Sequence, residues 1–287
     1  MNRLLRPFLL LLLCLAGMAP AEHAAAIVPF VRAADLLENE QAFRFSARLK
    51  DPRTVEVHYD VAPGYYLYRE NFRFAADGAQ LGKAALPPGK KKFDQNFNKI
   101  VETYRDSVVI LLPLRAAKGP VTLKVTSQGC ADVGVCYPPI VQSATLDPKS
   151  ARAPIDNLDV LPVAFNTAHT AGFTQVASST QLDTALQGGR VSMLDFYADW
   201  CGPCKQMQRL TFSDARVKQK LAALATLQAD VTRNSADDQA LLKRFKLVGP
   251  PGILFFDRQG KEIAALRVIG YQPPEKFLQT LEQAAQL

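Results

Sequence analysis

The sequence is poor in cysteine, histidine and tryptophan, with five, three and one of these residues among 287. Five cysteines are too few for a small scaffold held together by disulfides, so any cysteine chemistry must be local. Hydrophobic residues make up 48% and charged residues 21% of the chain. This composition excludes a mainly disordered chain, a collagen-like repeat and a coiled-coil rod. A chain of this length is expected to form two domains, each with its own core.

Residues 1–26 have the pattern of a secretory signal peptide. A basic start is followed by an apolar run of 12 residues, Phe8 to Ala19, and then by small residues. As a helix this run would be about 18 Å long, which is well short of the roughly 30 Å hydrocarbon core of a membrane. We expect cleavage after Ala21 or after Ala26. No later segment is long and apolar enough to span a membrane, so we expect the mature chain to be soluble and exported.

The charge pattern gives no support for nucleic-acid binding. The formal net charge is +7, and the one dense basic cluster, Lys90–Lys92, follows directly after Pro87-Pro88-Gly89. Because no further basic stripe accompanies this cluster, we predict a solvated loop there and no nucleic-acid partner.

Two parts of the chain differ in their hydrophobic pattern. Within residues 27–147, short alternating segments rich in Val, Tyr, Phe and Thr are separated by Gly, Pro and Asp, which predicts an antiparallel β-sandwich. Residues 173–287 alternate between strand and helix patterns and predict an α/β layer, with a strand over 264–270 and a last helix over 273–286. Residues 148–172 lack a sustained period and are predicted to be a linker.

Cys201 and Cys204 form a CxxC motif between a predicted strand and a predicted helix. At a helix N-terminus, free N–H groups and the helix dipole stabilise a Cys201 thiolate, the species that attacks a disulfide. Cys204 lies one turn further on and can resolve the resulting mixed disulfide. A static disulfide and a zinc site are the alternatives. Zinc requires four ligands, and the three histidines show no ligand spacing, so we expect redox-active disulfides with no metal and no other cofactor.

Asp195 lies six residues before Cys201, in a strand that is expected to be buried. A buried carboxylate with a raised pKa can accept the proton of Cys204 and return it. The alternative is a structural polar residue that is hydrogen-bonded to the backbone.

The segment from Asp195 to Lys205, DFYADWCGPCK, resembles the active-site segment of thioredoxins, and VGPPGI at 248–253 resembles the loop that holds their cis-proline. The resemblance implies a thioredoxin-like fold with Pro251 in cis, and it places Trp200, Pro250 and Pro251 in the substrate-contacting surface. Pro250 departs from the family because it has no N–H to donate to a substrate. We therefore predict peptide docking that is weaker by about 1 kcal/mol.

Cys130 and Cys136 are separated by five residues that include Asp and Gly. This spacing allows a disulfide across a short hairpin loop. By itself, the spacing favours a structural disulfide over a redox-active one.

A second resemblance changes this interpretation. GYYLYR at 64–69, together with QGCAD at 128–132 and CYPP at 136–139, resembles the periplasmic N-terminal domain of the DsbD family of disulfide reductases. MLDFYADWC at 193–201, continuing to TFSD at 211–214, resembles the C-terminal domain of that family. The resemblance implies an immunoglobulin-like N-terminal fold and a periplasmic location. It also implies that the Cys130/Cys136 pair takes electrons from the CxxC motif and passes them to other periplasmic thiol proteins, such as those of cytochrome c biogenesis.

The same resemblance implies that a cap loop with Phe97 shields the Cys130/Cys136 pair and that Tyr66 and Tyr68 line the site. For all three aromatic residues, ordinary core packing is the alternative.

The sequence departs from this family in three places. The family has a large membrane domain between the two periplasmic domains, whereas here only the predicted linker lies between them, so we expect a separate membrane electron donor. The CxxC interior is Gly202-Pro203 instead of the family's more usual Val-Ala. Gln208 stands where the family has an acidic residue, and its neutrality should leave the Cys201 pKa less raised.

These observations predict a periplasmic protein-disulfide reductase in which Cys201 and Cys204 pass electrons to Cys130 and Cys136. The main alternative is a thioredoxin-like reductase whose β-sandwich binds clients and carries a structural disulfide. A pure binding protein with inert disulfides is a third possibility.

Overall fold

The computed structural model describes residues 35–94, 99–115, 119–147, 155–156 and 172–286. The expected signal peptide, nearly all of the expected linker and Phe97 lie outside these residues. Residues Val31–Leu287 belong to one structural unit, and both domains described below lie within it. Among the described residues, no helix is long and apolar enough to cross a membrane.

The N-terminal part, residues 35–156, is built almost entirely from short strands and is called the sandwich domain here. Strand β2 illustrates why: its alternating pattern buries every second side chain, as expected for a strand with one face on a core. The elements are α1 (Asn39–Ala42), β1 (Phe43–Asp51), β2 (Thr54–Val61), β3 (Tyr65–Tyr68), η2 (Arg69–Asn71), β4 (Arg73–Asp77), β5 (Gln80–Leu81), β6 (Lys90–Asp94), β7 (Lys99–Tyr104), β8 (Ser107–Arg115), β9 (Val121–Ser127), β10 (Gly129–Ala131), β11 (Val135–Cys136), β12 (Ile140–Leu146) and β13 (Ile155–Asp156).

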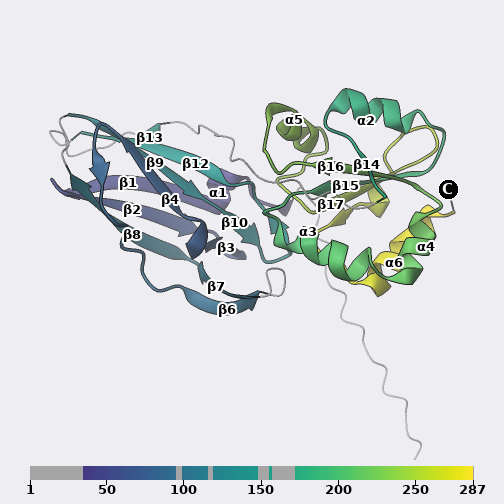
Figure 1. The fold of residues 1–287 in the computed structure, drawn as a ribbon, viewed down its shortest axis with the longest axis horizontal. Helices are drawn as coiled ribbons and strands as arrows, with labels where there is room; N and C mark the ends of the chain where they lie inside the picture. The colour runs from purple at the N-terminus through teal and green to yellow at the C-terminus, as the bar shows by residue number, and fades with distance from the viewer. Residues whose placement is uncertain (1–34, 95–98, 116–118, 148–154, 157–171, 287) are drawn as a thin grey trace, which may run out of the picture. The chain divides into compact units, whose positions relative to one another are not determined.

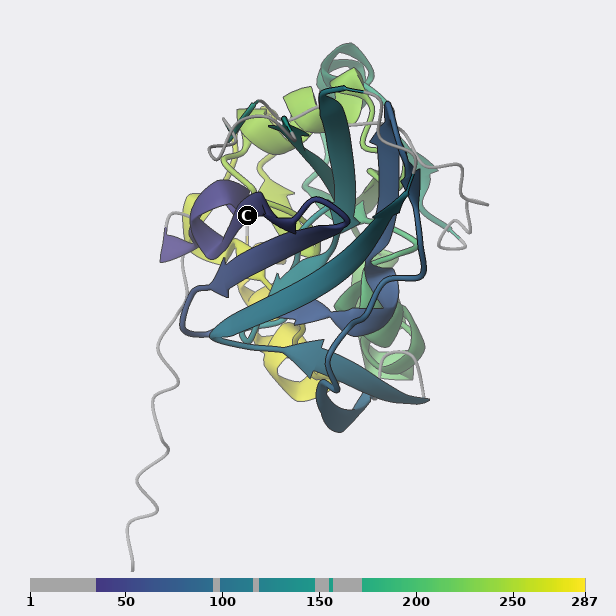
Figure 2. The same cartoon turned by 90° about the vertical axis from the view of Figure 1, so that its left-hand side faces the viewer.

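Two four-stranded sheets form the body of this domain, in the orders β1-β2-β8-β5 and β13-β12-β9-β4. The strands of the sandwich are nearest the viewer in Figure 2. Buried side chains from both sheets, such as Val57 on β2 and Leu123 on β9, share one hydrophobic core. This is the antiparallel, immunoglobulin-like sandwich that the sequence predicts.

A third sheet, in the order β11-β10-β3-β7-β6, carries both cysteines of the sandwich domain. Its strand β6 shows that the solvated loop predicted at Lys90–Lys92 is wrong, because these lysines begin a strand that pairs antiparallel with β7. The segment KKKFD has no alternating apolar residues, so its strand depends on pairing with residues 5 to 13 positions further along the chain. The hydrophobic pattern of a single segment does not predict such pairing.

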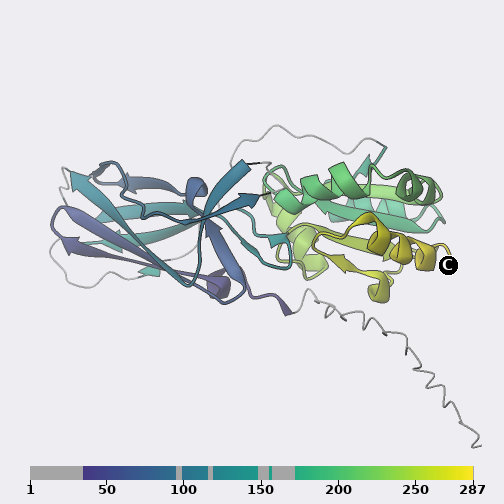
Figure 3. The same cartoon turned by 90° about the horizontal axis from the view of Figure 1, so that it is seen from below.

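The C-terminal part, residues 172–286, is called the thioredoxin domain. It has a mixed five-stranded sheet in the order β14-β16-β15-β17-β18. Figure 1 shows α2 and α5 on one face of the sheet and α3, α4 and α6 on the other, and Figure 3 places this second group in front of the sheet. The elements are β14 (Thr174–Gln175), α2 (Ser179–Leu186), β15 (Ser192–Tyr197), α3 (Gly202–Gln206), η3 (Met207–Thr211), α4 (Ala215–Leu221), β16 (Ala225–Asp230), α5 (Ala236–Arg244), β17 (Gly252–Phe256), η4 (Ala264–Leu266), β18 (Val268–Ile269) and α6 (Pro274–Ala284).

This α/β layer has the predicted thioredoxin-like fold, with two local differences. The strand predicted over 264–270 is reduced to the two residues of β18, because the 3-10 turn η4 takes up its first half. Helix α2 was not predicted, although Ser178 caps it by accepting a hydrogen bond from the Gln181 N–H.

Candidate redox site

The CxxC motif lies where strand β15 leads into helix α3. Cys201 is the N-cap of the helix, and its sulfur accepts a hydrogen bond from the backbone N–H of Cys204 over 3.1 Å. The two cysteines form a disulfide, and both are buried. In the reduced state, the same N–H group and the start of the helix stabilise a Cys201 thiolate.

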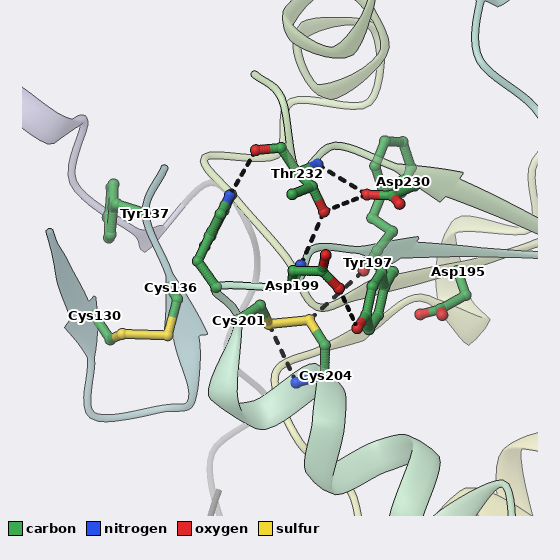
Figure 4. The surroundings of a disulfide bond; sticks show 12 residues. Cys130, Cys136, Tyr137, Asp195, Tyr197, Asp199, Cys201, Cys204, Asp230 and Thr232 are labelled. Atoms are coloured by element: carbon green, nitrogen blue, oxygen red, sulfur yellow. Dashed lines mark hydrogen bonds between the residues drawn. A yellow bond between two sulfur atoms is a disulfide. The ribbon is translucent and has the colours of Figure 1, made fainter. Parts of the chain in front are cut away.

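Trp200, which precedes the motif, is fixed by its indole. The indole N–H donates to the carbonyl oxygen of Thr232 over 3.0 Å. The Thr232 hydroxyl in turn donates to Asp230, as Figure 4 shows. The Trp200 side chain is therefore held on the thioredoxin domain.

Asp195 is a buried carboxyl group on β15, with a side chain that is 2% exposed. Burial raises its pKa to about 7, and the hydrogen bond from Gln228 opposes this rise. The sulfur of Cys204 lies 4.0 Å from the carbonyl oxygen of Phe196, the residue that follows Asp195. The carboxyl group thus has a pKa suited to proton transfer near neutral pH, and its catalytic role stays a prediction.

Cys130 and Cys136 face each other across the β10–β11 hairpin and form a disulfide. Neither cysteine is exposed. The turn of this hairpin contains Gly134 at φ +85°, a conformation that favours glycine. The sequence separation of the two cysteines therefore reflects a hairpin whose two strands are closed by the disulfide.

Tyr66 and Tyr68 lie beside this disulfide. Tyr66 is the direct neighbour of Cys130 in the β10–β3 ladder, and its ring meets the Tyr68 ring edge-on at 5.3 Å. The Tyr68 hydroxyl donates to Asp94 over 3.1 Å, and Lys92 Nζ lies 3.8 Å from the centre of the Tyr66 ring. Both tyrosines are buried and share one hydrophobic cluster with the four cysteines.

The cis-proline loop contacts the Cys130–Cys136 hairpin directly. The peptide bond between Pro250 and Pro251 is cis, and the Pro250 carbonyl oxygen accepts a hydrogen bond from the Cys136 N–H over 2.9 Å. Figure 4 shows the two disulfides near each other, with Cys136 on the side facing Cys201. Because Pro250 has no N–H, the return bond that another residue could form at this position is missing.

Two contacts in this region were not predicted from the sequence. The Gln128 amide donates to the Trp200 carbonyl oxygen over 3.4 Å, while its own oxygen accepts from Asn71 over 2.7 Å. Gly249 lies against the hairpin so closely that an added Cβ would collide with the Cys136 carbonyl oxygen. Gln128 precedes Gly129-Cys130 and Gly249 precedes Pro250-Pro251, so adjacency to each motif was the only available signal.

The chain thus has one disulfide at the N-terminus of a helix in a thioredoxin-like fold and a second buried disulfide beside it. Residues 33–148 match the family described as "Thiol:disulfide interchange protein DsbD, N-terminal", and residues 179–285 match the thioredoxin-like domain family. The chain therefore combines a DsbD-type N-terminal domain with a thioredoxin-like domain.

Individual proteins are similar to parts of this chain. The chain is 48% identical over 147 residues to the thiol:disulfide interchange protein DsbD of Ralstonia nicotianae, covering 49% of this chain and 24% of that protein. Among Neisseria meningitidis structures, the reduced DsbD N-terminal domain is 31% identical, with 44% of this chain and all of that chain covered and a TM-score of 0.40. The oxidised DsbD C-terminal domain is 32% identical, with 39% of this chain and 99% of that chain covered and a TM-score of 0.35. The match spans about a quarter of the curated relative's length.

Proposed function

We propose that this chain is a periplasmic protein-disulfide reductase in which Cys201 and Cys204 reduce the Cys130–Cys136 disulfide, which then reduces disulfides of other thiol proteins. The observation that carries the proposal is the hydrogen bond from the Cys136 N–H to the Pro250 carbonyl oxygen. This bond aligns the backbone of one disulfide with the loop beside the other. A purely structural Cys130–Cys136 disulfide would not require this alignment.

The exchange proceeds in two balanced steps. The Cys201 thiolate attacks the Cys136 sulfur, so that a Cys201–Cys136 bond forms, the Cys130–Cys136 bond breaks and Cys130 leaves as a thiolate. Cys204 then loses its proton and attacks the Cys201 sulfur. This second step closes the Cys201–Cys204 disulfide and releases Cys136 as a thiolate, so that one electron pair has moved.

Cys136 is the proposed target because its own N–H is bonded to the cis-proline loop. Cys130 lies on the neighbouring strand β10, where it pairs with Tyr66 on β3. Cys130 is therefore the leaving group in the first step, and it later acts as the resolving thiol. No further cofactor takes part in this scheme.

A pair of matched double variants tests the proposal. The chain with Cys130→Ser and Cys204→Ser keeps Cys136 and Cys201, whereas the chain with Cys136→Ser and Cys204→Ser keeps Cys130 and Cys201. Under mild oxidation by diamide at low protein concentration, we expect an intramolecular disulfide in the first chain, identified by peptide mapping. A disulfide that forms equally well in the second chain would contradict Cys136 as the target, and no disulfide in either would overturn the relay.

The wider function also belongs to the proposal. Export by the signal peptide places the chain in the periplasm, and a separate membrane protein supplies electrons to Cys201 and Cys204. A solved complex of the DsbD N-terminal and PilB N-terminal domains from Neisseria meningitidis is known, and we propose that thiol–disulfide proteins are also the partners here. Trapping the redox state of Cys201 and Cys204 in strains that lack candidate membrane donors tests the donor. Cysteines that stay reduced in all such strains would exclude it.

A further inference from the structure

Asp195 belongs to a row of three hydrogen-bonded side chains that crosses the sheet of the thioredoxin domain. The strands β14, β16 and β15 are parallel neighbours, and their register aligns Gln175 with Gln228 and Gln228 with Asp195. Gln228 Nε2 donates to Asp195 Oδ2 over 3.0 Å, and Gln175 Nε2 donates to Gln228 Oε1 over 3.0 Å. The row thus runs from an exposed residue on β14 to a fully buried carboxyl group.

The two bonds together fix which way the Gln228 amide points. An amide can turn over and exchange its oxygen with its nitrogen, which would aim an acceptor at Asp195. With Gln175 as donor, the Gln228 oxygen lies on the β14 side and the Gln228 N–H group faces the carboxyl group. Gln228 is buried completely, so water does not compete for its bond to Asp195.

We propose that Gln228 and Gln175 are positioning residues that keep the Asp195 carboxylate ionised and aimed for the proton of Cys204. A donor aimed at a buried carboxylate stabilises its charged form, whereas an acceptor would stabilise the protonated form. Gln228 acts on Asp195 directly, and Gln175 acts by fixing the Gln228 amide.

This inference rests on the proposed function, in which Cys204 must become a thiolate to close the Cys201–Cys204 disulfide. In that step the Asp195 carboxylate takes the proton from the Cys204 thiol, which leaves a neutral carboxylic acid and a Cys204 thiolate. The thiolate attacks Cys201, and Asp195 returns the proton when the disulfide is next reduced. A less stable carboxylate accepts this proton only at higher pH.

The groups around Asp195 leave Gln228 as its main polar neighbour among the described residues. From its own strand comes Tyr197, whose pKa is raised chiefly by burial and further by nearby carboxylates that include Asp195. Helix α3 contributes Cys204, β16 contributes the neutral Gln228, and β17 contributes apolar Ile253 opposite Asp195. Gln228 is neutral and Ile253 is apolar, so the carboxyl group is stabilised chiefly through the amide.

The test compares Gln228→Leu and Gln175→Leu with Thr174→Val, a control at the neighbouring exposed position of β14. Each full mature chain also carries Cys130→Ser and Cys136→Ser and is prepared with a peptide in mixed disulfide with Cys201. Release of the peptide by Cys204 is followed across pH, and the Asp195 carboxyl is titrated directly by carbon NMR.

We expect Gln228→Leu to move the midpoint of both titrations up by about one pH unit, that is, a roughly tenfold slower release below the midpoint. Gln175→Leu should move both in the same direction by less, about two- to threefold in rate, and Thr174→Val should move neither. An unchanged Asp195 titration in folded Gln228→Leu would overturn the inference. If that variant does not fold, an unchanged titration in Gln175→Leu overturns the role of the row.

Because every chain in this test lacks Cys130 and Cys136, its result does not depend on the relay and can fail separately from the proposed function. If Asp195→Asn leaves the pH profile of peptide release unchanged, Asp195 is not the base, and the link from the row to Cys204 is overturned. If Asp195→Asn removes the pH dependence but both glutamine variants titrate like the parent, the base stands and the positioning role is overturned.

Discussion

Gly249→Ala is the most direct test of how the two cysteine pairs meet. The added Cβ would collide with the Cys136 carbonyl oxygen and would lie 3.1 Å from the Cys136 carbonyl carbon and 3.4 Å from Tyr137 Cα. All three atoms belong to the main chain of the hairpin, so no side chain can turn away to make room. The hairpin must move back as a unit, which breaks the hydrogen bond between Cys136 and Pro250.

The expected magnitude follows from the loss of this bond and of the packing around it. Loss of the hydrogen bond costs about 1 kcal/mol, and the displaced hairpin also loses packing in the buried cluster that holds the four cysteines. Together these losses should exceed about 1.4 kcal/mol, which corresponds to at least a tenfold effect. Gly249 has no left-handed φ, so alanine should fit the thioredoxin domain itself.

The assay is the rate of Cys136–Cys201 disulfide formation in the chain with Cys130→Ser and Cys204→Ser. We expect Gly249→Ala to slow this rate at least tenfold, while the reaction of Cys201 with a small disulfide reagent stays unchanged. Gly188→Ala is the matched control, because its added Cβ would lie at an ordinary van der Waals distance of 3.5 Å from the Ala185 carbonyl oxygen. An unchanged rate in Gly249→Ala would refute the docking geometry.

Three further predictions concern the same site. Pro250→Thr restores a backbone N–H in the loop that contacts the Cys136 hairpin and should stabilise the mixed disulfide by about 1 kcal/mol, measured from its equilibrium with glutathione; no change would contradict the argument. Burial raises the Asp195 pKa to about 7, so the carboxyl favours folding below its unfolded pKa near 4, and this contribution is lost as pH rises through 7. In urea unfolding, the oxidised parent should lose about 2 to 3 kcal/mol between pH 5 and pH 8 relative to Asp195→Asn, and parallel curves would exclude the raised pKa. Replacing Cys130 and Cys136 by Ser should abolish reduction of client disulfides while leaving Cys201 and Cys204 reactive with a small disulfide; unchanged client reduction would instead favour the client-binding alternative.

Several features of the site were predictable because their signals are local. Asp195 lies in an apolar strand, so its burial and raised pKa follow from a short stretch of sequence. Cys201 and Cys204 are one helical turn apart at the start of a helix, and the spacing alone brings their sulfurs together. The Cys130–Cys136 pair closes a hairpin of its own.

Other features could not be predicted because they depend on the register of distant strands. The Lys90–Lys92 segment becomes a strand only because β7 pairs with it. Gln228 reaches Asp195 only because two parallel strands align them, although 33 residues separate the two in sequence. Neither a run of lysines nor a single glutamine forms a local pattern from which its partner can be predicted.

The sequence by itself determined that this protein has two domains with one cysteine pair each, since strand periodicity and cysteine spacing are properties of short segments. Only the tertiary structure decided how the pairs are related. The hydrogen bond from Cys136 to Pro250, the glycine at 249 and the amide of Gln128 join segments more than seventy residues apart. Their contact depends on how two separately folded surfaces fit together, and that fit is set by the packing of whole domains.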